Sequence, residues 1–130
     1  MSESIEASSV IPSSPQQIYD AWLSSEEHSA FTGDEARIDP VVGGRHSAFG
    51  DYIKGLNVQL EPPHRIVQTW RTTEFPADAP DSRLEILLDE VKGGTKVTML
   101  HTGIPDGQAK DYEKGWLDYY IQPMKEYFSK

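Results

Sequence analysis

Residues 106–128 read DGQAKDYEKGWLDYYIQPMKEYF, and their apolar side chains recur at intervals of three and four. This spacing is typical of an amphipathic α-helix, and Asp106 is a suitable residue to cap its start. Gly115 allows another element to approach closely, while Pro123 removes a backbone donor and predicts a kink near Tyr119. The pattern therefore predicts a long, interrupted helix with a broad apolar face that must cover something, formed by Tyr112, Trp116, Tyr119, Tyr120, Met124 and Tyr127.

Two short helices are predicted near the amino terminus. Ser14 and Ser24 each have a glutamine or glutamate three residues later, which is a helix-start pattern. The second of these helices is expected to carry Ala30 and Phe31 inward. It should end at Gly33, because a left-handed residue is least strained when it is glycine.

Short alternating runs separated by glycine, proline and aspartate predict antiparallel strands through the middle of the chain. Together with the terminal helix they indicate an α+β protein. Alternation in residues 53–60 favours Leu56, Val58 and Leu60 as the inward side chains. The expected strands are residues 4–11, 36–38, 45–49, 53–60, 65–72, 84–91 and 95–102.

Five motifs along this order resemble the AHSA-type family, which is named after the carboxy-terminal domain of the activator of the 90-kilodalton heat-shock protein ATPase. The resemblance covers about residues 5–128. The motifs are GGR at 43–45, the run from Gly55 to the prolines at 62–63, IVQTWR at 66–71, HTGIP at 101–105, and GW at 115–116 followed by YY at 119–120.

The resemblance implies the helix-grip fold of the START-like/SRPBCC superfamily over one domain, residues 1–130. In that fold a strongly curved antiparallel sheet of about six or seven strands wraps around the long carboxy-terminal helix, with two short helices after the first strand and an apolar cavity between sheet and helix. The family register points Gly55 and Asn57 toward the helix, against the alternation, and we follow the resemblance there. Relatives include lipid and sterol carriers, Bet v-like plant allergens, and cyclases or hydrolases, so the fold does not settle function.

The candidate site is a ligand-binding cavity whose walls follow from period-two alternation and from the helix face. If Ile66 and Trp70 point inward, so does Gln68, and the same holds for His101 beside Met99. These two polar groups either orient a polar end of an apolar ligand, or they lie near the rim of the sheet or bond to a helix residue such as Tyr120. The tryptophans are either ligand walls or core. The predicted cavity residues are Gln68, Trp70, Ile86, Met99, His101, Trp116 and Tyr120.

Composition excludes several classes of function. The chain has 130 residues, no cysteine, and 12 Lys and Arg against 21 Asp and Glu, which gives a net charge of −9. This charge repels nucleic acid and anionic headgroups. The sequence has no run of about 18 apolar residues, so no membrane-spanning helix is predicted. The acidic amino terminus has no apolar signal segment, and the absence of cysteine fits a reducing compartment, so we expect a cytoplasmic protein.

No chemical motif predicts an enzyme, a metal site or a cofactor. The four histidines have no metal-ligand spacing, no Gly-x-Ser-x-Gly sequence is present, and the glycines at 43–50 lack the lysine and serine of a phosphate loop. The leading hypothesis is a non-enzymatic domain that binds a small hydrophobic molecule. The alternative, implied by the resemblance, is a co-chaperone-like module that binds the 90-kilodalton heat-shock chaperone and modulates its ATPase, although nothing here corresponds to the co-chaperone's separate amino-terminal domain. A third possibility is a small enzyme that uses a polar pair in the cavity.

Overall fold

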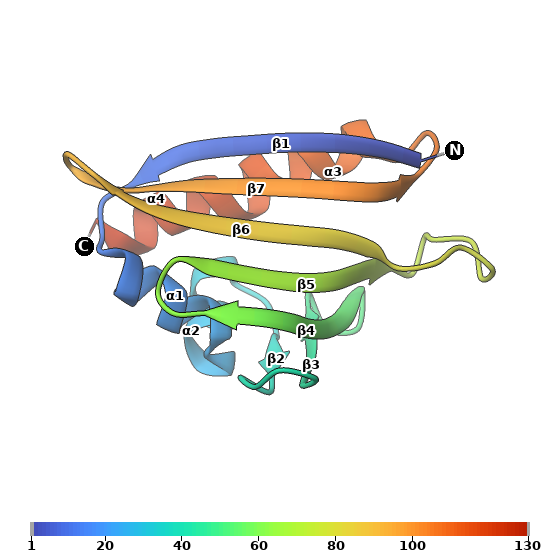
Figure 1. Ribbon diagram of the computed structural model, residues 1–130, viewed down its shortest axis with the longest axis horizontal. Helices are drawn as coiled ribbons and strands as arrows, with labels where there is room; N and C mark the ends of the chain where they lie inside the picture. The colour runs from blue at the N-terminus through green and yellow to red at the C-terminus, as the bar shows by residue number, and fades with distance from the viewer. Residues whose placement is uncertain (1, 130) are drawn as a thin grey trace.

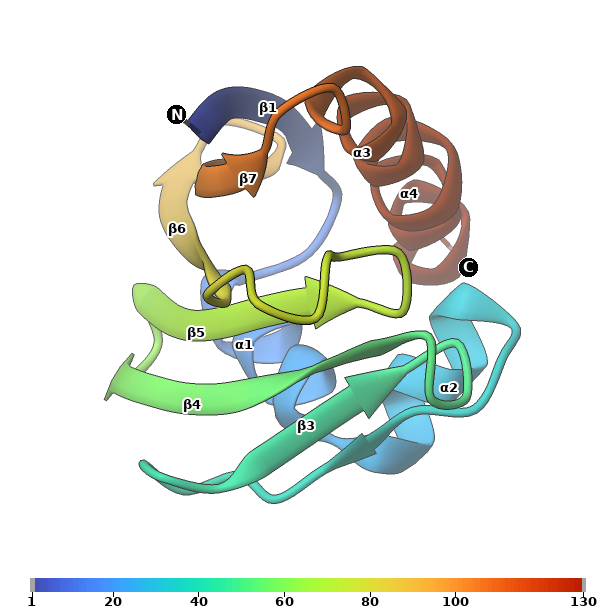
Figure 2. The ribbon, with the colours of Figure 1, turned by 90° about the vertical axis from the view of Figure 1, so that its right-hand side faces the viewer.

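One antiparallel sheet and a long helix dominate the computed structural model, which describes residues 2–129 (Figure 1). The seven strands lie in the order β1-β7-β6-β5-β4-β3-β2. The sheet bends, and the carboxy-terminal helix lies on its inner side with α1 and α2 (Figure 2). This is the predicted helix-grip fold. In chain order the elements are β1 (Ser2–Ile11), α1 (Pro15–Leu23), α2 (Ser25–Thr32), β2 (Arg37–Ile38), β3 (Arg45–Ala48), β4 (Ile53–Glu61), β5 (Arg65–Thr72), β6 (Ser82–Val91), β7 (Gly94–Pro105), α3 (Ala109–Gly115), η1 (Trp116–Ile121) and α4 (Gln122–Phe128).

In strand β4 the alternation and the family resemblance predict opposite inward faces, and the structure shows which prediction holds. Asn57 is buried, whereas Leu56 and Val58 are exposed, so the alternation-based prediction is wrong for these two residues and the family register is confirmed. The pairing with β5 shifts between Asn57 and Gln59. This irregularity changes which side chains face inward, and Leu60 packs against the core as the alternation predicted.

The two amino-terminal helices begin as predicted. The Ser14 and Ser24 side chains accept hydrogen bonds from backbone N–H groups three residues later, and Gly33 ends α2 with a φ of 79°. Phe31 is buried, but Ala30 is exposed, so the prediction for Ala30 is wrong. His28 is the other fully buried side chain of α2.

The carboxy-terminal helix starts later than the sequence suggested. It begins at Ala109, so Asp106 is not its cap; instead the Glu3 side chain of β1 accepts from the N–H groups of Gly107 and Ala109, at 2.9 and 3.2 Å. A carboxylate is favourable at this position because free N–H groups make a helix start electropositive. The first strand thereby anchors the last helix, an interaction that no local pattern encodes.

The interruption predicted from Pro123 is a π-helical turn, η1. The backbone N–H of Gln122 reaches back five residues to the carbonyl of Leu117. Proline has no N–H to donate in the following position, so the regular α-helical ladder cannot continue through it. The wider turn contains Trp116, which is buried against Trp70 and His101 of the sheet, and Tyr120, which is buried against α1 and α2.

Candidate functional site

An apolar groove of about 360 Å³ opens between the sheet and the carboxy-terminal helix. One wall is the turn between β3 and β4, part of the floor is Trp70 of β5, and the other wall is formed by α3 and η1. The volume is at the lower end of small-molecule sites, which span roughly 300–1,000 Å³. The lining residues are Phe49, Tyr52, Ile53, Trp70, Asp111, Tyr112, Gly115, Trp116, Tyr119 and Tyr120.

The turn between β3 and β4 supplies the outer aromatic wall. Phe49 has a φ of 51°, a left-handed conformation that is strained for a bulky residue, and its ring packs edge-on to Tyr119 and Tyr120. The Tyr52 hydroxyl donates to the carboxylate of Glu74. Burial, followed by this hydrogen bond to a carboxylate, raises the pKa of Tyr52. The wall is therefore aromatic on its inner side and has an acidic partner at its edge.

Three of the seven predicted cavity residues line this groove, namely Trp70, Trp116 and Tyr120. The other four are Gln68, Ile86, Met99 and His101, and each is at most 1% exposed within the packed interior. The structure thus brings the seven residues into one core without placing them all around one open space. The groove lies nearer the turn between β3 and β4 than the sequence suggested.

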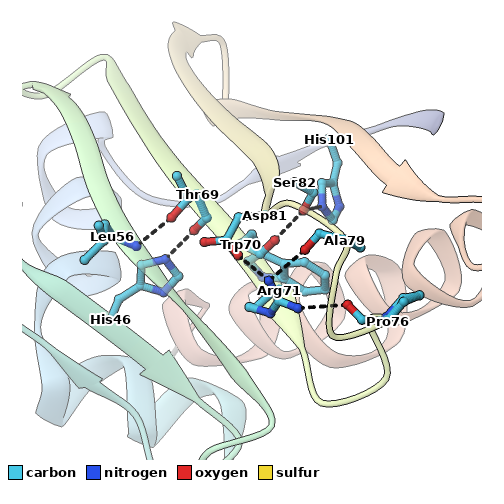
Figure 3. Close-up of polar contacts among 10 residues, drawn as sticks. All are labelled: His46, Leu56, Thr69, Trp70, Arg71, Pro76, Ala79, Asp81, Ser82 and His101. Atoms are coloured by element: carbon cyan, nitrogen blue, oxygen red, sulfur yellow. Dashed lines mark hydrogen bonds and ion pairs between the residues drawn. The ribbon is translucent and has the colours of Figure 1, made fainter. Parts of the chain in front are cut away.

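His101 of β7 is held in a series of hydrogen bonds that runs through Ser82, the first residue of β6, to Trp70 of β5 (Figure 3). Because the Trp116 indole can only donate, its N–H to His101 Nδ1 (3.1 Å) fixes the proton of the imidazole on Nε2. That Nε2–H donates to Ser82 Oγ at 2.8 Å, and the Ser82 hydroxyl donates to the Trp70 carbonyl at 2.6 Å. Burial lowers the pKa of His101 to about 3.

The pair Ser82 and His101 therefore lacks the arrangement of a nucleophile and its base. A base must accept the proton of the serine hydroxyl, but here the imidazole donates to that hydroxyl, and both residues are out of contact with solvent. This series of hydrogen bonds has a structural role because it connects β7, β6 and β5 to η1. The hydrogen bond between His101 and a helix residue is one of the alternatives open from the sequence, with Trp116 as the partner in place of Tyr120.

His28 makes a second link to the π-helical turn, and sequence reasoning missed it. Its Nδ1 lies 2.9 Å from the Trp22 carbonyl, which can only accept, so the Tyr120 hydroxyl donates to Nε2 at 3.0 Å. Burial lowers the pKa of His28 to about 4, although the bond to Trp22 opposes this effect. A histidine on an otherwise polar, short helix gave no periodic signal, and only the spacing of His28 before Phe31 could have suggested an inward face.

Gln68 belongs to a third buried network. Its amide oxygen accepts from the Trp22 indole at 3.3 Å, and its amide nitrogen donates to Asn57 Oδ1 at 2.8 Å. Asn57 in turn donates to the carbonyls of Asp39 and Val41. The polar atoms of Gln68 are therefore engaged by the protein itself.

Nothing in the described part of the chain resembles a metal centre: residues 2–129 contain no group of three or more histidine or carboxylate side chains that could hold an ion. Every buried side-chain nitrogen and oxygen within the same residues has a hydrogen-bond partner. No helix among them is long and apolar enough to cross a membrane. What the described residues do form is the aromatic groove between the sheet and the carboxy-terminal helix.

The family described as "Activator of Hsp90 ATPase homolog 1-like protein" matches residues 12–129. The chain belongs to this family. The match begins just after β1 and includes all the remaining strands and helices. The matched residues therefore contain the aromatic groove and the three buried networks.

Curated relatives in this family are longer than the chain. It is 32% identical over 117 residues to the Activator of 90 kDa heat shock protein ATPase homolog of Dictyostelium discoideum, which covers 89% of this chain and 30% of that protein. The human homolog 1 of the same activator is 26% identical over 115 residues, covering 88% of this chain and 34% of that protein. The chain thus spans about a third of these relatives, which are named as activators and not as catalysts.

Solved structures support the helix-grip architecture of the family. An HSP90 activator from Plasmodium falciparum superimposes with a TM-score of 0.89 at 22% identity, covering 97% of this chain and 96% of that one. The Aha1 dimer from Colwellia psychrerythraea gives 0.80 at 15% identity, with coverage of 97% and 96%. At these identities the likeness establishes the fold alone.

Proposed function

We propose that this protein is a co-chaperone-type domain that binds a 90-kilodalton heat-shock chaperone and modulates its ATPase. The supporting observation is the 32% identity to the Dictyostelium activator over 89% of the chain. This function places the protein in the compartment of its chaperone, the cytoplasm. The acidic balance of −9 suits a partner with a basic surface.

An exposed apolar patch supports recognition through the outer face of the sheet. Leu56 and Val58 of β4 are 43% and 49% exposed, and Val41 and Val42 of the loop between β2 and β3 are 52% and 64% exposed. The loop lies against β4, because the Gly43 N–H donates to the carbonyl of residue 57, between the two exposed strand residues. Clustered exposed apolar side chains commonly mark protein-interaction sites. We name these four residues the outer β4 patch.

The test is a binding and ATPase assay with the cognate chaperone at two salt concentrations. Wild type should bind, change the ATPase rate, and bind more weakly as salt rises, because exposed charges are screened. The double substitution Leu56→Thr with Val58→Thr keeps residues suited to a strand and should reduce binding. The matched control is Leu117→Thr, an exposed position on η1. The absence of any interaction of the wild-type protein with the chaperone would overturn this function.

The groove favours a second candidate function, the binding of a small, largely apolar molecule. Of its ten lining residues, seven are aromatic. An added Cβ at Gly115 would have its nearest neighbour, Tyr119 Cδ2, at 3.9 Å, so the groove has space at this point. Gly115→Leu should fill the groove and abolish binding of an apolar dye, whereas Gln122→Leu, on an exposed site of the same helix, should not.

A further inference from the structure

The charge distribution around the aromatic groove narrows the class of molecule that it could hold. Asp111 is the only charged residue among the ten that line it. Glu74 adds a second carboxylate at the edge, where it accepts from the Tyr52 hydroxyl. Within residues 2–129 no lysine or arginine side chain lines the groove, and Arg71 of the floor strand is engaged elsewhere by Asp81 and by the carbonyls of Pro76 and Ala79 (Figure 3).

The aromatic walls also favour a ligand with a positive charge. Ring faces carry negative electrostatic potential, so aromatic clusters attract cations with an apolar surface, above all alkylated ammonium groups. The Trp116 ring contacts both Trp70 and Tyr120, with centroids 5.5 and 4.9 Å away, and Tyr112 packs edge-on to Trp70 at 4.9 Å. The overall charge of −9 raises the local concentration of cations and opposes anions.

We propose that the groove binds a small amphiphilic ammonium compound, with its apolar body against the aromatic walls and its cationic group beside the exposed carboxylate of Asp111. The inference rests on the second candidate function, ligand binding, and specifies the charge of the ligand. An apolar carboxylate such as a fatty acid would face Asp111 and Glu74 without a basic partner. Among amphiphiles of equal chain length, the ammonium compound is therefore the preferred occupant.

The test compares three probes with the same decyl chain and different head groups: decyltrimethylammonium, decanol and decanoate. Binding is measured by calorimetry and by tryptophan fluorescence below the concentrations at which the probes form micelles. We expect decyltrimethylammonium to bind about tenfold more tightly than decanoate, the ratio that corresponds to about 1.4 kcal/mol of combined cation–π and carboxylate attraction. Asp111→Asn should reduce this ratio severalfold.

Two groove variants separate binding in the groove from binding to the acidic surface. Gly115→Leu fills the groove and leaves the net charge unchanged, and Gln122→Leu is its matched control. Tyr119→Ala removes an exposed part of the groove wall. It is the second groove variant and replaces Gly115→Leu if that protein does not fold. Decyltrimethylammonium should lose affinity for both groove variants and keep it for the control.

The outcomes distinguish the cation inference from the function on which it rests. If decanol or decanoate binds the wild type as tightly as the ammonium probe, and Gly115→Leu abolishes this binding, the groove is a ligand site but the cation inference is wrong. If the ammonium probe binds wild type and groove variants equally, it binds the acidic surface, and the inference is again overturned. If none of the three probes binds, both the inference and the ligand-binding function fail.

Discussion

Acidification should destabilise this protein because two of its histidines are buried in the neutral form. In the unfolded chain a histidine takes up a proton near its ordinary pKa of about 6.5. In the folded protein burial lowers the pKa of His28 to about 4 and that of His101 to about 3. Protonation therefore favours the unfolded state between pH 6.5 and these values. Stability is fully present above pH 6.5 and is lost as the pH falls through this window.

The expected loss follows from the width of the pH interval. Each histidine contributes a slope of about 1.4 kcal/mol per pH unit while the unfolded chain is protonated and the folded protein is not. Lowering the pH from 7 to 5 should therefore cost about 2 kcal/mol for each residue, or about 4 kcal/mol for both. Burial also lowers the pKa of His46, which acts in the same direction. A loss of this size is a large part of the 5–15 kcal/mol that stabilises most domains.

The assay is urea denaturation at several pH values between 7 and 5 in high salt, which suppresses the changing repulsion among the acidic groups. The variants His28→Gln and His101→Gln lower stability at every pH, so the informative quantity is the slope of unfolding free energy against pH. Each variant should lose one histidine's share of that slope. A wild-type protein equally stable at pH 5 and pH 7, or unchanged slopes in both variants, would refute this account of the buried imidazoles.

Three further substitutions test how the site is held in place. Gly55→Ala should destabilise by about 1–3 kcal/mol in urea denaturation, because its Cβ would lie 1.9 Å from the Thr69 carbonyl oxygen; a neutral result would contradict the close approach. Gly115→Ala should have the opposite sign, up to about 1 kcal/mol of stabilisation, since alanine favours a helix and this position is open. Glu3→Ala should cost about 0.5–2 kcal/mol and speed amide hydrogen exchange at Ala109, and unchanged exchange would show that the carboxylate does not cap the helix.

Much of the fold could be predicted because its elements follow local and periodic rules. Strand β5 occupies the predicted residues 65–72, and both serine caps of the short helices form as the sequence indicated. The positions where prediction failed depend on distant partners. The start of α3 is set by Glu3, more than a hundred residues earlier in the chain, so a local search for a capping residue selected Asp106 instead.

Strand β4 shows why alternation alone misassigned a face. Its pattern of Leu56, Val58 and Leu60 is regular, but the buried residue is Asn57, which bonds to Gln68 and to two carbonyls of the loop before β3. A buried amide is stable only when such partners satisfy it, and a single strand does not reveal them. The apolar residues left outside form part of the outer β4 patch, which makes this strand informative about function.

The candidate site was harder to predict than the fold, because alternation gives the face of a side chain but not its partners. Gln68 and His101 do point into the interior, yet the Trp22 and Trp116 indoles and the Asn57 amide engage their polar atoms. His101 holds η1 against the sheet, whereas Gln68 holds α1 against it. Gln68 and His101 do not line the groove. Its selectivity must therefore come from aromatic ring faces and from the carboxylate of Asp111. The charge of the ligand, more than its hydrogen bonding, is therefore the property by which this groove should discriminate.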